Sequence, residues 1–183
     1  QLFKRSMGTS EMFYLDGEAF SATDLSTLVV KQLVADAESY LGEKVDEVLI
    51  SVPAYFNEKQ RSATKAIGQR LGIKVERLIN EPSAAAISCH KIGKDESFIV
   101  FDFGGGTLDV SVVDCFDNVI SIVSIAGDNF LGGSDFDKAI AEDFCQSQRI
   151  DLEKLDRKQK SSLLLSAERC KLKLQKEKVA AVS

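Results

Sequence analysis

Hydrophobic residues recur with helix-like and strand-like spacing along the first half of the chain. Between Ser21 and Gly42 they return every four positions, which predicts an amphipathic helix with a capped start and a glycine stop; these residues are Leu25, Val29, Leu33, Ala37 and Leu41. Residues 46–52 form a mostly apolar run that predicts a buried strand. Strand and helix then alternate, with a helix from Asn57 to about Gly72, a strand over residues 75–79, and a short helix from Pro82 to Gly93.

The second half begins with three strand-like segments in succession. They cover residues 97–103, 107–115 and 119–126, and three glycines at 104–106 join the first two, which predicts an antiparallel meander. Two helices follow, from Ser134 or Asp135 to about Arg149 and from about Arg157 to Lys176, and a further strand begins at Val179. Since no linker-like segment interrupts the chain, we expect any domain boundary in an ordered turn between Lys94 and Ser97.

Composition and charge argue against several classes of partner and site for this α/β chain. The 183 residues are 44% hydrophobic and 28% charged, enough for a sizeable core, and the net charge of −5 argues against a nucleic-acid partner. No apolar run approaches the roughly 20 residues that span a bilayer, and no signal-like stretch opens the sequence, so we expect a cytoplasmic protein without membrane association. The four cysteines form no C-x-x-C, and the single histidine, His90, excludes a multi-histidine metal site; it falls late in the short helix.

The most specific chemical signal is the glycine run between two strands. Asp102 ends one strand, Gly104, Gly105 and Gly106 form the connection, and Thr107 begins the next strand. Glycines let backbone N–H groups approach phosphate oxygens, and a carboxylate beside them can hold hydrated Mg²⁺. The run is neither a Walker A loop nor a Rossmann fingerprint. It predicts a phosphate-binding hairpin, although a glycine-rich turn without a ligand remains the alternative.

Three further patterns fit a nucleotide site. Glu81 ends a strand and opens a helix, which makes it a candidate for orienting or deprotonating a water molecule. Gly132 and Gly133 precede a helix whose free N–H groups can receive an anion, although such a loop is also a common helix entry. Helical spacing places Glu168, Lys171 and Gln175 on one face, a pattern that by itself more often describes a solvated charged surface.

Four segments in register resemble the DnaK-type chaperones of the seventy-kilodalton heat-shock family. They are Val52-Pro-Ala-Tyr-Phe-Asn, Ile79-Asn-Glu-Pro-Ser-Ala-Ala-Ala, Phe101-Asp-Phe-Gly-Gly-Gly-Thr-Leu-Asp-Val and Ala126-Gly-Asp-Asn-Phe-Leu-Gly-Gly. The opening Leu2-Phe-Lys-Arg looks closest to the bacterial HscC branch of that family. The resemblance covers essentially the whole chain and implies an actin-like ATPase fold, related to ribonuclease H, with mixed β-sheets flanked by helices.

The resemblance also implies roles for individual residues. Lys4 would reach the γ-phosphate region, Glu81 would act on the attacking water, and Asp102 and Thr107 would serve the metal and the phosphate, with Asp102 holding Mg²⁺ through water. Further contacts with ATP or ADP would come from Gly104, Gly105, Gly106, Gly132, Gly133, Glu168, Lys171, Leu172 and Gln175. Pro53 and Arg61 match positions that relay the nucleotide state, and Arg77 falls where J-domain cochaperones dock; unfolded peptides and a nucleotide-exchange factor are the other implied partners.

The chain departs from the family pattern at four positions and, by the family layout, is an internal fragment. Ser83 stands for threonine and Ser134 for glutamate, while Leu172 and Gln175 alter the adenosine helix. Lobe I would comprise residues 1–17, from its upper subdomain, and 18–96, from its core. Lobe II would begin with 97–132 and continue with the upper subdomain over 133–183. Because two nucleotide-contacting loops and the substrate domain would lie outside the chain, we expect this fragment to be nearly inactive and to self-associate through exposed strand edges.

Two other functions use the same fold. A metabolic kinase would share the glycine hairpin but need a pocket for a sugar or an acid near Pro53. An actin-like structural protein would use hydrolysis to time filament assembly. The segments that begin at Ile79 and Ala126 favour the chaperone ATPase over both.

Overall fold

The computed structural model describes residues 2–89, 94–117 and 119–182, which form two compact units. The first unit comprises Gln1–Asp102 and Asp109–Gly127, and the second comprises Phe103–Leu108 and Asp128–Ser183. The glycine hairpin therefore belongs to the second unit, while the strands that lead into it belong mostly to the first. This division does not test the expected four-part subdomain layout, which stays a prediction.

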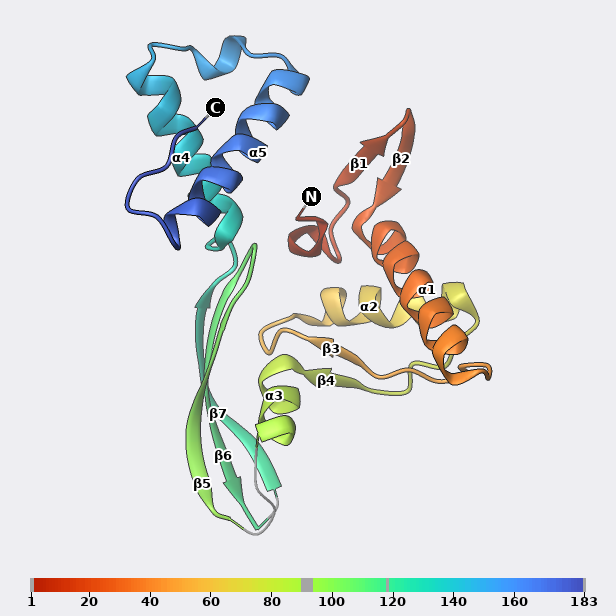
Figure 1. Ribbon diagram of the computed structural model, residues 1–183. Helices are drawn as coiled ribbons and strands as arrows, with labels where there is room; N and C mark the ends of the chain where they lie inside the picture. The colour runs from red at the N-terminus through yellow and green to blue at the C-terminus, as the bar shows by residue number, and fades with distance from the viewer. Residues whose placement is uncertain (1, 90–93, 118, 183) are drawn as a thin grey trace. The chain divides into compact units, whose positions relative to one another are not determined.

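Helices and strands alternate from α1 to β5 in the first unit, between a β-hairpin near its start and a three-stranded meander (Figure 1). The 3-10 helix η1 and a β-hairpin precede the long helix α1, and the later helices α2 and α3 lie between short strands. The bounds are η1 Phe3–Ser6, β1 Met12–Leu15, β2 Glu18–Ser21, α1 Ala22–Leu41, β3 Ile50–Val52, α2 Glu58–Leu71, β4 Leu78–Asn80, α3 Glu81–Cys89, β5 Glu96–Phe103, β6 Leu108–Phe116 and β7 Val119–Asp128.

The β1–β2 hairpin was not foreseen from the sequence. Its antiparallel register runs from Met12 opposite Ser21 to Leu15 opposite Glu18. Asp16 and Gly17 have φ values of 50° and 88°, the left-handed conformation that two-residue hairpin turns require. The Asp-Gly pair is the local signal that could have revealed it.

Helix α1 confirms the expected helix but not its expected buried face. Ser21 and Asp24 form a reciprocal capping box, and Gly42 ends the helix with φ 74°. Leu25 is buried, whereas Val29, Leu33 and Leu41 are exposed. Residues four apart drift by about 40° around a helix, so five such residues turn through about 160° and cannot share one face.

Helix α2 and the strands on either side of it follow the prediction with shorter strands. Asn57 and Gln60 form a reciprocal capping box at the predicted start of the helix, and Gly72 ends α2 with φ 67°. Strands β3 and β4 pair in parallel, with Ile50 opposite Leu78 and Val52 opposite Asn80. Outside these strands, only a single parallel bridge between Glu47 and Lys74 extends the pairing among the described residues.

Strands β5, β6 and β7 form one sheet in that order, as the predicted meander requires. Their short connections leave no room for a crossover, so neighbouring strands run antiparallel. Helix α3 packs against this sheet, with Ala86 meeting Val113 and Cys115 (Figure 1). The helix begins at Glu81, one residue before the expected Pro82, and the expected positions of His90 and Gly93 lie outside the described residues.

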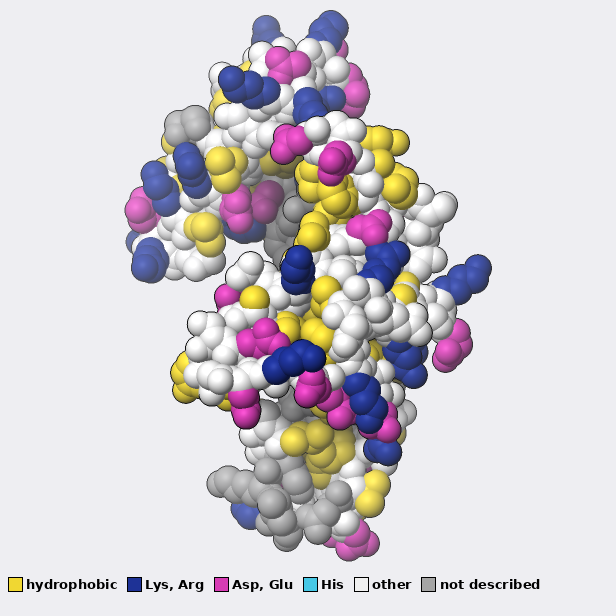
Figure 2. Space-filling model, turned by 90° about the vertical axis from the view of Figure 1, so that its right-hand side faces the viewer, with side chains coloured by type: hydrophobic (Ala, Val, Ile, Leu, Met, Phe, Trp, Pro, Cys, Tyr) yellow, Lys and Arg dark blue, Asp and Glu magenta, His cyan; other side chains and the backbone are white. Residues whose placement is uncertain are grey.

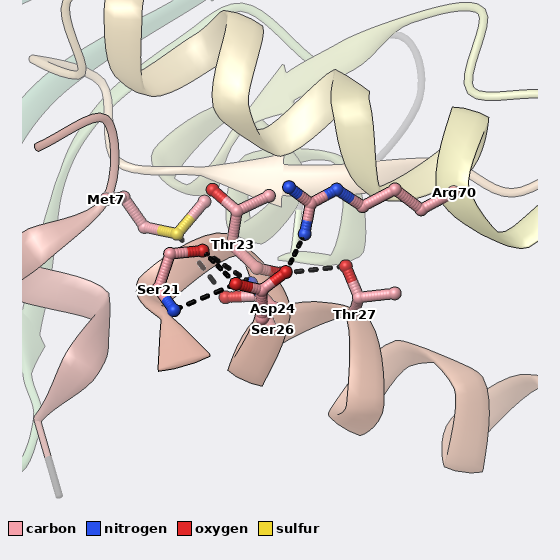
Figure 3. A network of polar contacts seen from close by, with 7 residues as sticks. All are labelled: Met7, Ser21, Thr23, Asp24, Ser26, Thr27 and Arg70. Atoms are coloured by element: carbon pink, nitrogen blue, oxygen red, sulfur yellow. Dashed lines mark hydrogen bonds and ion pairs between the residues drawn. The ribbon is translucent and has the colours of Figure 1, made fainter. Parts of the chain in front are cut away.

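A second core joins η1, α1 and α2. Met7, Ala22 and Ile67 are its buried members. Beside it, the start of α1 is held by polar contacts (Figure 3): the Ser26 hydroxyl donates to Met7 Sδ, and Arg70 of α2 pairs with Asp24. The ion pair links the end of α2 to the first turn of α1, where Asp24 forms the capping box with the N-cap Ser21.

The second unit is mainly a pair of packed helices (Figure 1). Helix α4 spans Gly133–Ser147, the 3-10 helix η2 spans Leu152–Lys154, and α5 spans Arg157–Leu174. Ala141 and Cys145 of α4, with Ala167 and Cys170 of α5, are buried. The strand expected from Val179 is absent from the described residues: the chain has no regular secondary structure between the end of α5 and Val182.

Hydrophobic side chains also remain at the surface. Leu28 and Leu33 of α1 are more than half exposed, and Figure 2 shows hydrophobic side chains among charged ones on the face that it presents. On the open side of the β5–β7 sheet, Ile99 and Val123 are similarly exposed. No helix within the described ranges is long and apolar enough to cross a membrane.

We expect Asp24→Asn to lower stability in a pH-dependent way. Hydrogen bonds from the Ser21 side chain and backbone, and then Arg70, lower the pKa of Asp24 from 3.8. A lowered folded pKa adds stability above the unfolded pKa, and this contribution is lost as the pH falls through the folded value. Because Asp24 is partly exposed, the loss at neutral pH should be about 0.5 kcal/mol and should shrink toward about pH 3. Urea unfolding at neutral pH and at about pH 3 measures this loss of unfolding free energy. Asp143→Asn, an exposed change on α4, is the control, and an equal pH dependence in both variants would refute the assignment.

The cysteines should react at very different rates with a thiol reagent. Cys89 is exposed, whereas Cys115, Cys145 and Cys170 are buried, and burial raises the pKa of the Cys115 thiol. In the native protein we expect rapid labelling of Cys89 alone, and labelling of all four thiols after denaturation. Mass spectrometry of the peptides identifies which cysteines are labelled. Rapid labelling of Cys115 in the native protein would contradict the fold of the β5–β7 sheet.

Candidate functional site

The glycine hairpin and the start of α4 form one backbone-bonded cluster in the second unit. The hairpin closes with a bond from Gly104 N–H to the Thr107 carbonyl, at 3.0 Å. Gly133 N–H then donates to Gly104 O at 3.0 Å, and Ser134 N–H donates to Gly105 O at 2.9 Å. The first N–H groups of α4 are thus occupied by the hairpin, which corrects the expectation that they are free to receive an anion.

Gly132 is required by this close backbone contact. A Cβ atom there would lie 2.4 Å from Gly106 N and 2.6 Å from the Gly105 carbonyl carbon, closer than atoms can approach. Gly132 N–H donates to Asp135 Oδ2 at 2.9 Å, which caps the helix. Its role in the structure is therefore to let α4 approach the hairpin, and any direct contact with a nucleotide stays a prediction.

Gly105 is different, because the fold itself gives no reason for a glycine there. Within the described part of the chain, a Cβ at Gly105 would meet nothing within 4 Å, and one at Gly104 would meet only Thr107 O, at 3.9 Å. Neither residue has the left-handed φ that favours glycine. Open space beside a bare backbone is what a phosphate-binding loop needs.

Two carboxyl groups flank the hairpin in sequence, on strands of the first unit. Phe98 and Val100 of β5 and Val113 of β6 pack on the α3 side of the sheet. Because side chains alternate along a strand, Asp102 and Asp109 lie on this same side. Asp102 is exposed, but Asp109 is only 7% exposed and neither of its carboxyl oxygens has a hydrogen-bond partner among the described residues.

An unpartnered buried carboxyl group is costly, so Asp109 is a candidate cation ligand that sequence reasoning did not single out. The strict alternation of β6, which buries Asp109, Ser111, Val113 and Cys115, is the signal that could have found it. Carboxylate oxygens suit Mg²⁺. Within the part of the chain that is described, no three acidic, histidine or cysteine side chains form a metal-binding group, so a cation here would need further ligands from water or phosphate.

Lys4 and Glu81 come together although 77 residues separate them. Lys4 Nζ lies 2.9 Å from Glu81 Oε1, and the two side chains are 52% and 21% exposed. Glu81 is the first residue of α3 and directly follows β4, so the strand-to-helix junction fixes its backbone. The ion pair orients the carboxylate while leaving it accessible to water.

The residues expected to relay the nucleotide state lie near this junction. Pro53 is fully buried after β3. Arg61 donates to Asn80 Oδ1 at 2.9 Å and to the carbonyls of Ala54 and Phe56, so α2 is tied to the residue before Glu81. Arg61 and Arg77 both line a shallow pocket of about 350 Å³, together with Glu58, Ser62, Lys65, Glu76 and Leu78.

On α5, the expected nucleoside face is only partly available. Glu168, Leu172 and Gln175 are exposed, and Gln175 follows the last residue of the helix. Lys171 instead donates to Gly133 O at 2.7 Å and pairs with Asp137 Oδ1 at 2.7 Å. Asp137, which the sequence did not single out, helps to line a groove of about 340 Å³ with Glu168, Ser134, Lys138, Ser161, Leu164 and Leu165.

A comparison with protein-family models gives one match that covers nearly the whole chain. The model described as Hsp70 protein matches residues 4–183. The match includes Lys4, Glu81, the glycine hairpin and α5, and agrees with the resemblance that the four sequence segments indicated.

We expect Gly132→Ala and Gly105→Ala to differ sharply in stability. The alanine methyl group at 132 would overlap backbone atoms, which should cost about 1–3 kcal/mol of unfolding free energy. At 105 the methyl group meets open space, so the change should be within about 0.5–1 kcal/mol and can be stabilising. Urea unfolding of the two variants measures this contrast. Equal destabilisation would show that the contact between the hairpin and α4 is not as described.

Proposed function

Because the chain belongs to the Hsp70 family, whose members are ATP-dependent chaperones, we propose that it binds Mg-ATP at the glycine hairpin and takes part in ATP hydrolysis. In the complete protein this cycle would drive binding and release of unfolded peptides. The observation that carries the proposal is the open backbone at Gly104 and Gly105, where neither strain nor crowding explains the glycines. A phosphate group is the ligand that such a loop accommodates.

The chemistry that we assign to Glu81 is that of a water-positioning base. Its carboxylate is held by Lys4 at 2.9 Å, so the side chain does not have to be ordered when the substrate arrives. The Lys4 ammonium would stabilise negative charge on the transferring phosphoryl group. No covalent intermediate is needed, because the attacking group is water.

Asp102 and Asp109 would hold the metal, Asp102 through water, and Thr107 would contact the phosphate. Magnesium bound with ATP neutralises charge on the phosphate oxygens. The Asp109 carboxyl group, buried without a hydrogen-bond partner among the residues that the structure describes, supports a cation at this position. Contacts with the rest of the nucleotide are proposed for Gly106, Gly132, Gly133, Glu168, Lys171, Leu172 and Gln175.

The finer assignments also remain proposals. An actin-like fold in the complete domain is consistent with the small parallel and antiparallel sheets and their helices. The shared pocket of Arg61 and Arg77 supports a surface that senses the nucleotide and receives a J-domain cochaperone, with Pro53 as part of the relay. Membership of the HscC branch, client peptides and an exchange factor are expected from resemblance alone.

Replacing Glu81 with Gln tests the proposed chemistry. In the complete gene product, we expect Glu81→Gln to slow single-turnover hydrolysis by about 10² or more, the usual scale for a positioned base, while Mg-ATP affinity changes little. Rapid-quench kinetics and calorimetry measure the two quantities. The control is Glu47→Gln, because the Glu47 side chain forms an exposed ion pair with Lys74, at 3.8 Å, and has no part in the proposed chemistry.

Measuring what stimulates ATP turnover in the same gene product distinguishes a chaperone from a kinase or a filament protein. An unfolded peptide should stimulate turnover by a chaperone, whereas a sugar would stimulate a kinase and polymerisation a filament protein. Hydrolysis that Glu81→Gln leaves intact would refute the role of Glu81, and failure to bind Mg-ATP at all would refute the proposed function.

A further inference from the structure

The contact between α5 and α4 is built around one lysine ammonium. Lys171 Nζ lies 2.7 Å from Gly133 O and 2.7 Å from Asp137 Oδ1. These partners are one helical turn apart at the start of α4, so the ammonium sits over the first turn of that helix. The side chains of Lys171 and Asp137 are 26% and 12% exposed, which makes this the most buried of the ion pairs measured among the described residues.

The same contact connects α5 to the glycine hairpin. Gly133 accepts the Lys171 hydrogen bond through its carbonyl and donates its own N–H to Gly104 O at 3.0 Å. A short chain of polar contacts therefore runs from Asp137 through Lys171 and Gly133 to Gly104, all within the second unit. A shift of the Lys171 ammonium would alter its hydrogen bond to Gly133, the residue that is bonded to the hairpin.

Asp137 is poorly explained as a purely structural residue. Its Oδ1 atom is buried, and its one partner among the described residues is the Lys171 ammonium at 2.7 Å. A buried carboxylate with one charge partner gives little net stability, because desolvation offsets the attraction. What the pair does provide is a fixed lysine, since an unpaired lysine side chain would sample many rotamers.

We propose that Asp137 is a positioning residue, which holds Lys171 ready to donate to the oxygens of a nucleoside diphosphate or triphosphate. The inference rests on the proposed nucleotide function. The ammonium has three donors; one engages Gly133 O and one faces Asp137 Oδ1, each at 2.7 Å, so the third remains for a ligand, which the partial exposure of the lysine lets in. Ordering the lysine before binding lowers the entropic cost of the contact.

The test measures MgADP binding to the complete gene product by calorimetry. Asp137→Asn keeps the shape of the side chain but removes its charge, and we expect affinity to fall roughly 3- to 10-fold, as for one side chain that must be ordered on binding. Lys171→Met should weaken binding at least as much. Asp137→Glu keeps the charge and should restore part of the affinity. Asp143→Asn, an exposed change on the same helix, should bind like the unaltered protein.

The double variant separates positioning from general damage. If Asp137 acts through Lys171, Asp137→Asn should cause no further loss in the Lys171→Met background. Additive losses, or Asp137→Asn binding as tightly as the unaltered protein, would overturn the inference while leaving the nucleotide function intact. If the unaltered protein does not bind MgADP, both the inference and the proposed nucleotide function are refuted. Should Asp137→Asn fail to fold by circular dichroism, Asp137→Glu replaces it in the same cycle, and additivity there is again the contrary result.

Discussion

The second unit depends on the approach of two backbones that a single methyl group would prevent. Gly132 lies so close to the glycine hairpin that a Cβ atom would fall 2.4 Å from Gly106 N. This approach lets Gly133 and Ser134 donate their N–H groups to Gly104 and Gly105. The start of α4 and the hairpin are thereby fixed to each other, and Lys171 then ties α5 to the same point through Gly133. The helix pair and the loop form one cluster because of this contact.

The glycines in this cluster serve different needs, although the sequence presents them as equivalent. Gly132 is needed for packing, whereas Gly105 stands beside open space with a backbone that other residues could adopt. Hydrogen-bonded helix N–H groups cannot also bind an anion, so phosphate recognition in the proposed function falls to the hairpin rather than to α4. The effect of a glycine-to-alanine substitution in this cluster therefore differs from one glycine to the next.

Charged groups in the two units follow a common pattern. Lys4 with Glu81 and Lys171 with Asp137 each join residues far apart in sequence, and each leaves the lysine partly exposed. Pairs of this kind contribute little stability but limit where the side chains can go. Asp109 lacks even such a partner among the described residues. The polar groups of the candidate site are therefore arranged at some cost to the fold, as expected of groups that await a ligand.

The sequence by itself determined the features that depend on neighbours three or four residues apart. The capping boxes at Ser21 and Asn57 and the stops at Gly42 and Gly72 rest on such local contacts, and the β5–β7 meander follows from alternating strands joined by short turns. The Asp16-Gly17 turn was equally local and was overlooked. Only the tertiary structure decided which face of α1 is buried, that Lys4 meets Glu81, and that Asp137 is buried. The reason is physical: these outcomes depend on side chains brought together from distant segments, and no spacing along the chain encodes which segments will meet.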